Sequence, residues 1–249
     1  RRQAVPIMAE AAVLPGELSD PLAEDADMVV PGLTRRYPNR ALLYVSHTCA
    51  VYCRHCTRRR KVSDPQSRLD VDGLSQAIQW IADHPEVDDI VLSGGDPLSL
   101  SDARLEQLLG ELRPHARMIR LGTRHPTTLP QRITPGLCKV LERYPPIYVM
   151  THFNHPKECT PEAGRALDLL ADAGCVLSNQ SVLLRGVNDD VESLRTMHRW
   201  LLAHRCRPYR LYHCDFSQGV AHFRVPLSRG LEILGDLRGY TSGLSVPEY

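Results

Sequence analysis

The stretch ALLYVSHTCAVYCRHCTRRRKV, residues 41–62, decides the fold, because it opens a repeating pattern in which a strand leads into a chemically unusual loop. The β-rich run ALLYVS is followed directly by Cys49, Cys53 and Cys56. Three thiolates at the spacing C-x3-C-x2-C are soft ligands suited to zinc or to an iron–sulfur cluster. A cubane cluster has one iron more than this loop has cysteines, so one iron stays open to an outside ligand. The alternative is a structural zinc site completed by His47 or His55.

Further β-rich runs follow the first one along the chain. They are DIVLSG (89–94), MIRLGT (118–123), IYVMTH (147–152), CVLSNQSVLL (175–184) and PYRLYHC (208–214). Each is followed by a segment of helical character. Strands that alternate with helices predict parallel pairing with right-handed crossovers. The sequence therefore predicts an α/β fold, an open and partial (β/α)6 TIM-like barrel, although a doubly wound sheet has the same order of elements.

The segment after the run 147–152 shows the clearest helical pattern. Thr160 can cap this helix, Pro161 suits its first turn and Gly174 can end it. Apolar stripes at helical spacing occur here and after two other runs. They are Ala163, Ala166, Leu167 and Leu170; Leu105, Leu108, Leu109 and Leu112; and Val191, Leu194, Met197 and Leu201.

The ligand site of either fold lies at the carboxyl ends of the parallel strands. The unusual residues of this chain follow the predicted strands at that edge. They are Cys49 after the first run, Gly94, Gly95 and Asp96 after the second, His152 after the fourth and Asp215 after the sixth. We therefore expect one site at this edge.

Composition excludes several classes of protein. A net charge of +1 argues against a nucleic-acid partner, whose binding proteins are usually strongly basic. No apolar stretch approaches the roughly 20 residues that a membrane helix needs, and the opening RRQAVPIMAE does not look like a signal peptide. Eight cysteines are too sparse for a disulfide scaffold, so we expect a reducing cytoplasm.

The chain divides into three parts by composition. Residues 1–40 are rich in proline and acids and show no sustained period, so they predict an irregular N-terminal arm over the surface. Residues 41–225 hold the strand and helix repeats of the barrel. Residues 226–249 form a C-terminal segment.

The motif CAVYCRHC is that of the radical S-adenosylmethionine (SAM) enzymes, and with TRRR behind it the stretch resembles the lysine 2,3-aminomutase family. The resemblance continues through LTRRYPNRALLYVSHTC, LSGGDPLSL, LPQRIT, THFNHPKE, NQSVLLRGVND and CDFSQGVAHFRVPLSRG. It implies a [4Fe–4S] cluster, SAM and pyridoxal 5′-phosphate (PLP) as cofactors. It also implies an isomerase that converts L-lysine, or a similar basic amino acid, to its β-amino isomer by 1,2-amino migration.

The resemblance assigns cofactor-binding roles to three groups of residues. Cys49, Cys53 and Cys56 match the cluster ligands; Gly94, Gly95, Asp96, His152 and Gln180 match residues that bind SAM; Arg36, Tyr37 and Arg40 match residues that hold the phosphate of PLP. The residues alone leave other interpretations open. The SGGD stretch suits a plain strand-to-loop turn, the amide of Gln180 could be satisfied by backbone in an apolar strand, and the Arg/Tyr group could be a surface patch.

Two residues match positions that bind the substrate. Arg58 matches the arginine that holds the substrate carboxylate, although a basic run such as Arg58 to Lys61 is often a solvated face. Asp215 matches a contact to the side-chain ammonium of lysine, which favours a basic amino acid over glutamate. The alternative for Asp215 is an ion pair with a structural cation such as Arg224.

The family also needs a lysine that forms a Schiff base with PLP. This chain has only Lys61, Lys139 and Lys157, and none lies in a glycine-rich context. The family lysine lies a little beyond TSG-x-x-VP, whereas this sequence ends at TSGLSVPEY. We therefore expect an internal section of a longer enzyme rather than a shortened relative.

The resemblance also implies partners and leaves two other functions open. The expected partners are a small amino acid substrate, a reductant such as flavodoxin or ferredoxin, and further copies of the chain in a homo-oligomer, with no nucleic acid and no membrane. One alternative is a related radical SAM enzyme that acts on a lysine of a translation elongation factor. The other is a zinc-binding module without catalysis.

Overall fold

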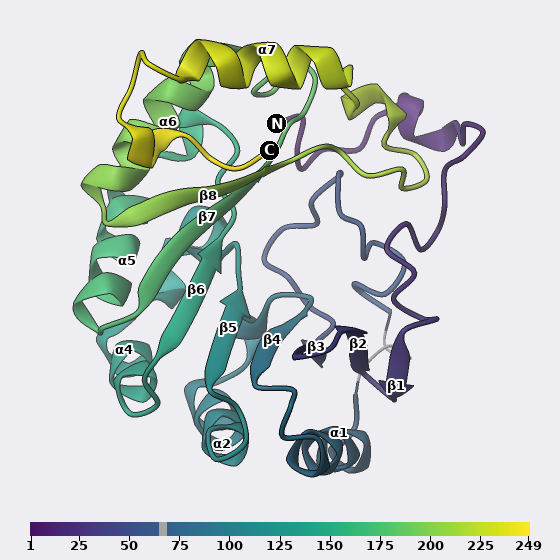
Figure 1. Ribbon diagram of the computed structural model, residues 1–249, viewed down its shortest axis with the longest axis vertical. Coiled ribbons are helices and arrows are strands. Elements are labelled where there is room, and N and C mark those ends of the chain that lie inside the picture. Colours follow the sequence, from purple (N-terminus) through teal and green to yellow (C-terminus); the bar gives the residue numbers. More distant parts are fainter. Residues whose placement is uncertain (65–68) are drawn as a thin grey trace.

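A computed structural model describes residues 1–64 and 69–249, and an eight-stranded sheet with the order β1 to β8 forms its centre. The six strands β3 to β8 pair in parallel with their neighbours. Figure 1 shows the sheet as a curved wall, with α1, α2, α4, α5 and α6 outside it. The edge strands β1 and β8 are not paired with each other, so the architecture is the expected partial barrel.

The six parallel strands coincide with the β-rich runs of the sequence. They are β3 (Arg40–Ser46), β4 (Asp89–Gly94), β5 (Met118–Gly122), β6 (Ile147–Thr151), β7 (Val176–Val182) and β8 (Cys206–Tyr212). Their side chains alternate between the helices and the concave face. Ile119 and Leu121 of β5 are fully buried in the core, whereas Arg120 and Gly122 line a cavity on the other face.

The connections between these strands are helical, as predicted. The α-helices are α1 (Val71–Asp83), α2 (Asp102–Leu112), α3 (His125–Thr128), α4 (Pro135–Glu142), α5 (Pro161–Asp172), α6 (Val191–Ala203) and α7 (Leu227–Leu237). Short 3-10 turns are η1 (Met8–Ala11), η3 (Pro97–Ser99), η4 (Pro130–Arg132), η5 (Pro156–Glu158), η6 (Ala221–Phe223) and η7 (Gly243–Ser245). Among the helices of the described residues, none is long and apolar enough to cross a membrane.

The helix α5 forms for the reasons that its sequence indicates. The side chain of Thr160 accepts a hydrogen bond from the backbone N–H of Ala163 and caps the first turn. Gly174 has a φ of +76°, a left-handed conformation that favours glycine just past a helix end. The apolar stripe of α5 is buried against the sheet, and so are the stripes of α2 and α6 apart from the half-buried Val191.

The N-terminal arm contains two strands that the sequence analysis did not predict. β1 (Met28–Val30) and β2 (Leu33–Tyr37) form a hairpin around Gly32, and β2 pairs antiparallel with β3. Leu33 lies opposite Leu43 and is fully buried. The expectation of an irregular arm is therefore wrong for residues 28–37, because pairing with β3 outweighs the weak local pattern. The rest of the arm is irregular apart from η1 and a bridge at Leu18.

The C-terminal segment lies against the outer edge of β8. The backbone N–H of Leu211 donates to the carbonyl of Glu248, and the N–H of Glu248 donates to the carbonyl of Tyr209. The hydroxyl of Tyr249 lies 2.9 Å from Nδ1 of His213. The division of the chain at residues 40 and 225 stays a prediction.

Candidate functional site

The three cysteines of the motif lie on the loop between β3 and α1, at the carboxyl edge of the parallel strands. Figure 1 shows this loop on the concave side of the sheet. Cys49, Cys53 and Cys56 are half-buried free thiols. The backbone N–H of Cys56 donates to the carbonyl of Cys53, which closes a tight turn between these two cysteines.

The glycine motif after β4 supports the start of this loop. Gly94 has a φ of +104°, and a Cβ on it would lie 2.6 Å from the carbonyl oxygen of Ser46. The backbone N–H groups of Gly95 and Asp96 donate to the carbonyls of Ser46 and Thr48. Only glycine permits this approach of backbone to backbone. The glycines therefore fix the cysteine loop on β4, and their role toward SAM stays a prediction.

The carboxylate of Asp96 is buried and bonded within the protein. It accepts hydrogen bonds from the hydroxyl of Thr123, the backbone N–H of Arg124 and the backbone N–H of Leu98. Nδ1 of His125 lies 2.7 Å from the same carboxylate. The side chain of Asp96 thus holds the loop after β5 beside the loop after β4. The role of Asp96 toward SAM stays a prediction.

The thiols influence one another electrostatically. Burial, with smaller contributions from the charges of Asp96, Cys56 and Cys53, raises the pKa of Cys49 to about 12. Burial also raises the pKa of Cys56, with a smaller contribution from Cys53. The raised pKa values mean that Cys49 and Cys56 are disfavoured as free thiolates in this loop. A bound metal centre would offset this cost, because coordination removes the thiol proton.

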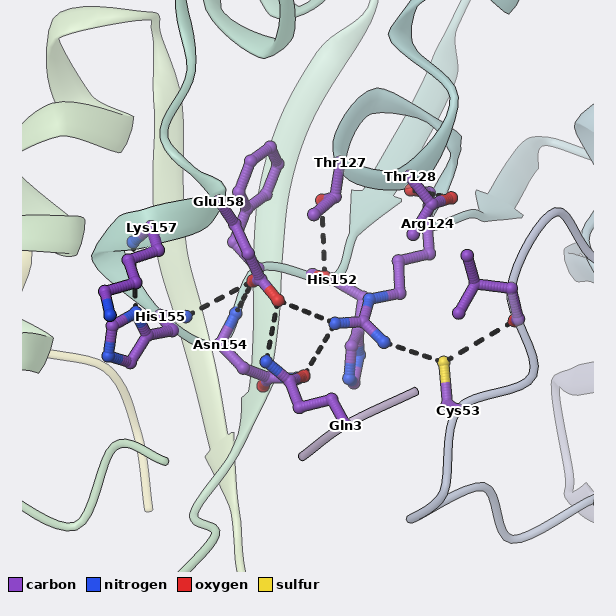
Figure 2. Close-up of polar contacts among 12 residues, drawn as sticks. Gln3, Cys53, Arg124, Thr127, Thr128, His152, Asn154, His155, Lys157 and Glu158 are labelled. Atoms are coloured by element: carbon purple, nitrogen blue, oxygen red, sulfur yellow. Dashed lines mark hydrogen bonds and ion pairs between the residues drawn. The ribbon is translucent and has the colours of Figure 1, made fainter. Parts of the chain in front are cut away.

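Arg124 is the cation nearest to Cys53. Its Nη1 lies 2.8 Å from Sγ of Cys53, and its Nη2 lies 2.8 Å from Oε1 of Glu158 (Figure 2). The Arg124 side chain is 11% exposed, so this contact is shielded from water. A largely buried guanidinium that the sequence analysis did not identify therefore lies against the sulfur of Cys53.

His152 forms a stacked pair with His55 of the cysteine loop. The ring centroids lie 5.4 Å apart with an interplanar angle of 15°, and the two Nε2 atoms are 3.2 Å apart. Burial, with a smaller effect from Arg124, lowers the pKa of His152 to about 3. Burial also lowers the pKa of His55, followed by the effect of His152. Both imidazoles are therefore neutral at pH 7, and one donates a hydrogen bond to the other.

A cavity of about 340 Å³ lies on the concave face beside this loop. Arginines and tyrosines dominate its polar lining, as an anion site requires. Polar residues of the lining are Arg36, Tyr37, Arg40, Arg58, Arg120, Gln180 and Tyr212, together with Glu24, Asp27, Thr34 and Ser93. Three of the four arginines are held by carboxylates: Asp89 pairs with Arg120, Glu24 pairs with Arg58, and Asp27 lies 3.9 Å from Arg36. Arg40 stacks on Tyr37, 4.0 Å from its ring centroid. The structure thus brings the predicted PLP-phosphate residues into one cavity with Arg58.

Gln180 faces this cavity from β7. Its amide Nε2 donates to the hydroxyl of Tyr212 at 3.3 Å. The expectation of an amide inside an apolar strand is wrong, because β7 places Asn179 and Ser181 in the protein interior and Gln180 on the half-buried concave face. The interior polar groups bond to each other and to Phe153. Gln180 therefore lines the cavity, and its role toward SAM stays a prediction.

Asp215 follows β8 by three residues and is half-buried. Its predicted alternative partner, Arg224, instead pairs with the fully buried carboxylate of Glu17. The pairing of Asp215 with Arg224 is therefore wrong for this structure, because the arm supplies a closer acid. Burial raises the pKa of the Asp215 carboxyl, while His213 and Arg58 oppose this rise. A ligand cation would satisfy Asp215 better than its present surroundings do.

The basic run after the cysteines is not a solvated face. Acidic residues of the N-terminal arm bind each of its cations. Glu24 pairs with Arg58, Glu10 with Arg59, Asp20 and Asp25 with Arg60, and Asp25 with Lys61. Arg54 within the loop also pairs with Glu10. The acidic composition of residues 10–27 could have indicated these ion pairs, but the sequence analysis did not connect it with the basic run.

The donor set does not suit a single metal ion. Within residues 1–64 and 69–249, no three His, Cys, Asp or Glu side chains converge closely enough to hold one ion. Zinc needs its ligands at about 2.0 to 2.3 Å from one point, whereas the cysteines of a cubane bind different irons. His55, one of the proposed zinc ligands, turns its Nε2 to His152. The arrangement favours the iron–sulfur interpretation.

Comparison with known proteins identifies relatives of this chain. The profile of the Radical SAM superfamily matches residues 43–197. The L-lysine 2,3-aminomutase of Fusobacterium nucleatum is 51% identical over the whole chain, which spans 59% of that protein. A putative L-lysine 2,3-aminomutase of Aquifex aeolicus is 45% identical over the whole chain, which spans 68% of it.

A solved structure supports the fold. It is that of a radical SAM methyltransferase from Sphaerobacter thermophilus, with a TM-score of 0.58 and 19% identity over 87% of this chain and 67% of that one. The chain spans less than two thirds of the Fusobacterium relative, so the comparison establishes ancestry along the part that both share. Cysteine motif, profile and relatives coincide on the same residues: the chain belongs to the lysine 2,3-aminomutase family of the radical SAM superfamily.

Proposed function

We propose that the protein is an aminomutase that converts L-lysine, or a similar basic amino acid, to its β-amino isomer by 1,2-amino migration. The observation that carries this proposal is the position of Asp215. Among the residues that the structure describes, the half-buried carboxylate of Asp215 makes no ion pair; it lies within electrostatic reach of Arg58, which lines the arginine-rich cavity. One group suits an ammonium and the other suits a carboxylate, which are the two ends of a basic amino acid.

The cysteine loop fits the cluster that membership of the superfamily implies. Cys49, Cys53 and Cys56 supply three thiolates and leave one iron for SAM. Two buried nitrogens beside this loop, Nδ1 of His55 and Nε of Arg124, have no hydrogen-bond partner among the described residues. Such orphaned groups fit a site whose remaining acceptors belong to a bound group. When bound, the cluster and SAM supply a 5′-deoxyadenosyl radical and PLP supplies a π-system that delocalises substrate radicals.

The arginine-rich cavity fits the phosphate of PLP. Arg40, which has an aromatic neighbour rather than an ion-pair partner among the described contacts, is the residue best able to take a phosphate oxygen. Arg36 and Tyr37 stand next to it at the end of β2. None of the three lysines lines the cavity: Lys139 and Lys157 are exposed, and Lys61 pairs with Asp25. The described residues therefore supply the phosphate-binding part of a PLP site and no Schiff-base lysine.

Arg58 orients the substrate carboxylate in this proposal. Glu24 accepts from Nε and Nη2 of Arg58, while Nη1 lies 3.4 Å from the hydroxyl of Ser93, a residue of the cavity lining. The ion pair with Glu24 fixes the plane of the guanidinium, and Nη1 is left for the substrate. Gln180 and Tyr212, which are hydrogen-bonded to each other, also line this cavity.

The partners and the compartment follow from the same chemistry. Reduction of a cluster needs an electron donor, and a flavodoxin or ferredoxin is the expected class. All eight cysteines are unpaired thiols, which fits a reducing cytoplasm. A homo-oligomer is also expected from the family resemblance.

Two other functions predict different results in the same assay. A relative that acts on a lysine of a translation elongation factor would cleave SAM only with that protein, and a zinc module would hold zinc without sulfide. The test uses holoenzyme of the full-length protein to which this chain is expected to belong, prepared without oxygen and supplied with SAM, PLP and a reductant. We expect about four irons per chain, 5′-deoxyadenosine and β-lysine from L-lysine, and none of the β-amino product from L-glutamate. Holoenzyme with an intact cluster that leaves L-lysine unchanged would overturn the assignment.

A further inference from the structure

Arg124 lies at a junction of four chain segments. It lies two residues after β5, at the carboxyl edge of the sheet, and its backbone N–H donates to Asp96. Its side chain reaches back across the edge to the cysteine loop, and it also meets the N-terminal arm and the loop after β6 (Figure 2). No role that we have described so far explains why a buried cation occupies this place.

The two terminal nitrogens of the Arg124 guanidinium bind different partners. Nη2 donates to Oε1 of Gln3 at 2.6 Å and to Oε1 of Glu158 at 2.8 Å, while Nη1 faces Sγ of Cys53 at 2.8 Å. Figure 2 shows the guanidinium between the carboxylate on one side and the sulfur on the other. The first two contacts fix the plane of the guanidinium, so Nη1 is held on the sulfur.

The partners of Arg124 are themselves fixed. Oε1 of Glu158 accepts from the amide of Gln3, and Oε2 accepts from the backbone N–H groups of Asn154 and His155. The amide of Asn154 donates to Oε1 of Gln3. Glu158 is therefore saturated with donors, and its carboxylate can balance the charge of Arg124 only in part. A simple structural ion pair would not need a third contact on a sulfur.

We propose that Arg124 is a positioning residue for the cluster, which holds the Cys53 sulfur and raises the reduction potential of the iron–sulfur centre. The inference depends on the proposed function, in which Cys53 ligates that centre. Reduction adds one electron, from an external donor, and takes the [4Fe–4S] core from 2+ to 1+ while Arg124 keeps its protons. The added negative charge is stabilised by a buried cation bonded to a ligand sulfur, and hydrogen bonds to sulfur are known to tune this potential.

The charge arrangement predicts effects of opposite sign for two neutralising substitutions. Arg124→Gln removes the cation and should lower the potential, whereas Glu158→Gln removes the balancing anion and should raise it. Both substitutions break the same Arg124–Glu158 ion pair. A purely structural role for the pair would therefore give changes of the same sign, or none, in the two variants.

The experiment is a redox titration of the anaerobic holoenzyme followed by electron paramagnetic resonance, with iron and sulfide measured per chain. We expect Arg124→Gln to shift the reduction equilibrium about tenfold toward the oxidised cluster, which is about 59 mV for a one-electron couple. Glu158→Gln should shift the equilibrium toward the reduced cluster. Arg124→Lys should shift it less than Arg124→Gln does, because lysine keeps the positive charge but lacks the two-pronged hydrogen bonding of the guanidinium. Arg132→Gln is the matched control, since Arg132 bonds to Leu98 and Leu100 away from the cysteines and should leave the potential unchanged.

Each outcome decides for or against the role of Arg124. A folded Arg124→Gln protein that has lost iron supports it, because Cys53 is then no longer held. Full iron content with the wild-type potential in Arg124→Gln, or shifts of the same sign in Arg124→Gln and Glu158→Gln, overturns it. If Arg124→Gln does not fold, Arg124→Lys and Glu158→Gln give the decision by the same readout. A wild-type protein without iron and sulfide would instead sink the proposed function, and the role of Arg124 with it.

Discussion

Glu24 and Arg58 form a two-point ion pair that ties the N-terminal arm to the chain just behind the cysteines. Nε of Arg58 lies 2.8 and 3.0 Å from the two carboxylate oxygens of Glu24. The hydroxyl of Tyr44 donates to the same carboxylate at 2.6 Å. The arm thus supplies the acid that orients a residue of the proposed substrate site.

Glu24→Gln should lower the free energy of unfolding, because it leaves the Arg58 cation without its counter-charge. Breaking a buried pair costs about 3 to 5 kcal/mol, and we expect about 2 kcal/mol here since the Arg58 side chain is 21% exposed. Asp25→Asn, at a side chain that is 56% exposed, should cost less than about 1 kcal/mol. The double variant Glu24→Gln with Arg58→Met should be more stable than Glu24→Gln alone. Urea unfolding measures all three, and equal losses for Glu24→Gln and Asp25→Asn would contradict the proposed burial of the pair.

Cys53→Ala should abolish the cluster and with it the cleavage of SAM. Two cysteines cannot retain the three irons that the loop is proposed to hold, so iron should fall from about four per chain to a small fraction of that value. Cys175→Ala is the control, because Cys175 is a buried thiol at the start of β7 and far from the loop in sequence. Iron and sulfide analysis with a 5′-deoxyadenosine assay tests both variants. Retained cleavage in Cys53→Ala would refute the ligand role.

Arg40→Gln should weaken binding of the PLP phosphate without weakening binding of the ring. Loss of one charge-assisted contact is expected to reduce the affinity for pyridoxine 5′-phosphate about tenfold. This ligand lacks the aldehyde, so the result does not depend on a Schiff-base lysine. Pyridoxine without phosphate should bind both proteins equally, and Arg165→Gln, at an exposed arginine of α5, should change neither affinity. If calorimetry shows that Arg40→Gln weakens the binding of both ligands equally, Arg40 does not act on the phosphate.

Asp215→Asn should stabilise the folded protein at neutral pH and weaken binding of lysine. Burial raises the pKa of Asp215 above its ordinary value of 3.8, so the folded state binds this proton more tightly than the unfolded state does. The charged form is therefore a cost to folding at pH values above the folded-state pKa, and the cost disappears as the pH falls below 3.8. Thermal unfolding should show a higher Tm for Asp215→Asn at pH 7 and equal Tm values in acid. A lower Tm at pH 7 would mean that a cation in the protein already satisfies Asp215.

Much of the fold was accessible from local sequence patterns. β4 begins and ends where its β-rich run does, and α5 has the cap, the first-turn proline and the terminal glycine that its sequence indicates. The residues that determine these elements lie close together in the sequence, so a local sequence pattern is enough to predict them. β1 and β2 were not predicted because the arm has no clear alternation, and their stability comes from pairing with β3.

The site was predictable where it depends on position along a strand. The carboxyl ends of the parallel strands brought Cys49, Gly94, His152 and Asp215 to one edge, as expected. Arg124 stands at the same edge two residues after β5 and could have been found by the same rule. Its contact with Cys53 was not predictable, because it depends on where the loops turn after leaving the sheet. The ion pairs between the arm and the basic run also join residues that no sequence window contains together.

An unclosed barrel has two strand edges whose backbone groups can recruit another chain. In this protein β1 offers an edge of only three residues, and residues near Glu248 bond to the backbone of β8 from outside. Short or covered edges are poor templates for uncontrolled strand addition. The barrel can therefore stay unclosed with little tendency toward aggregation.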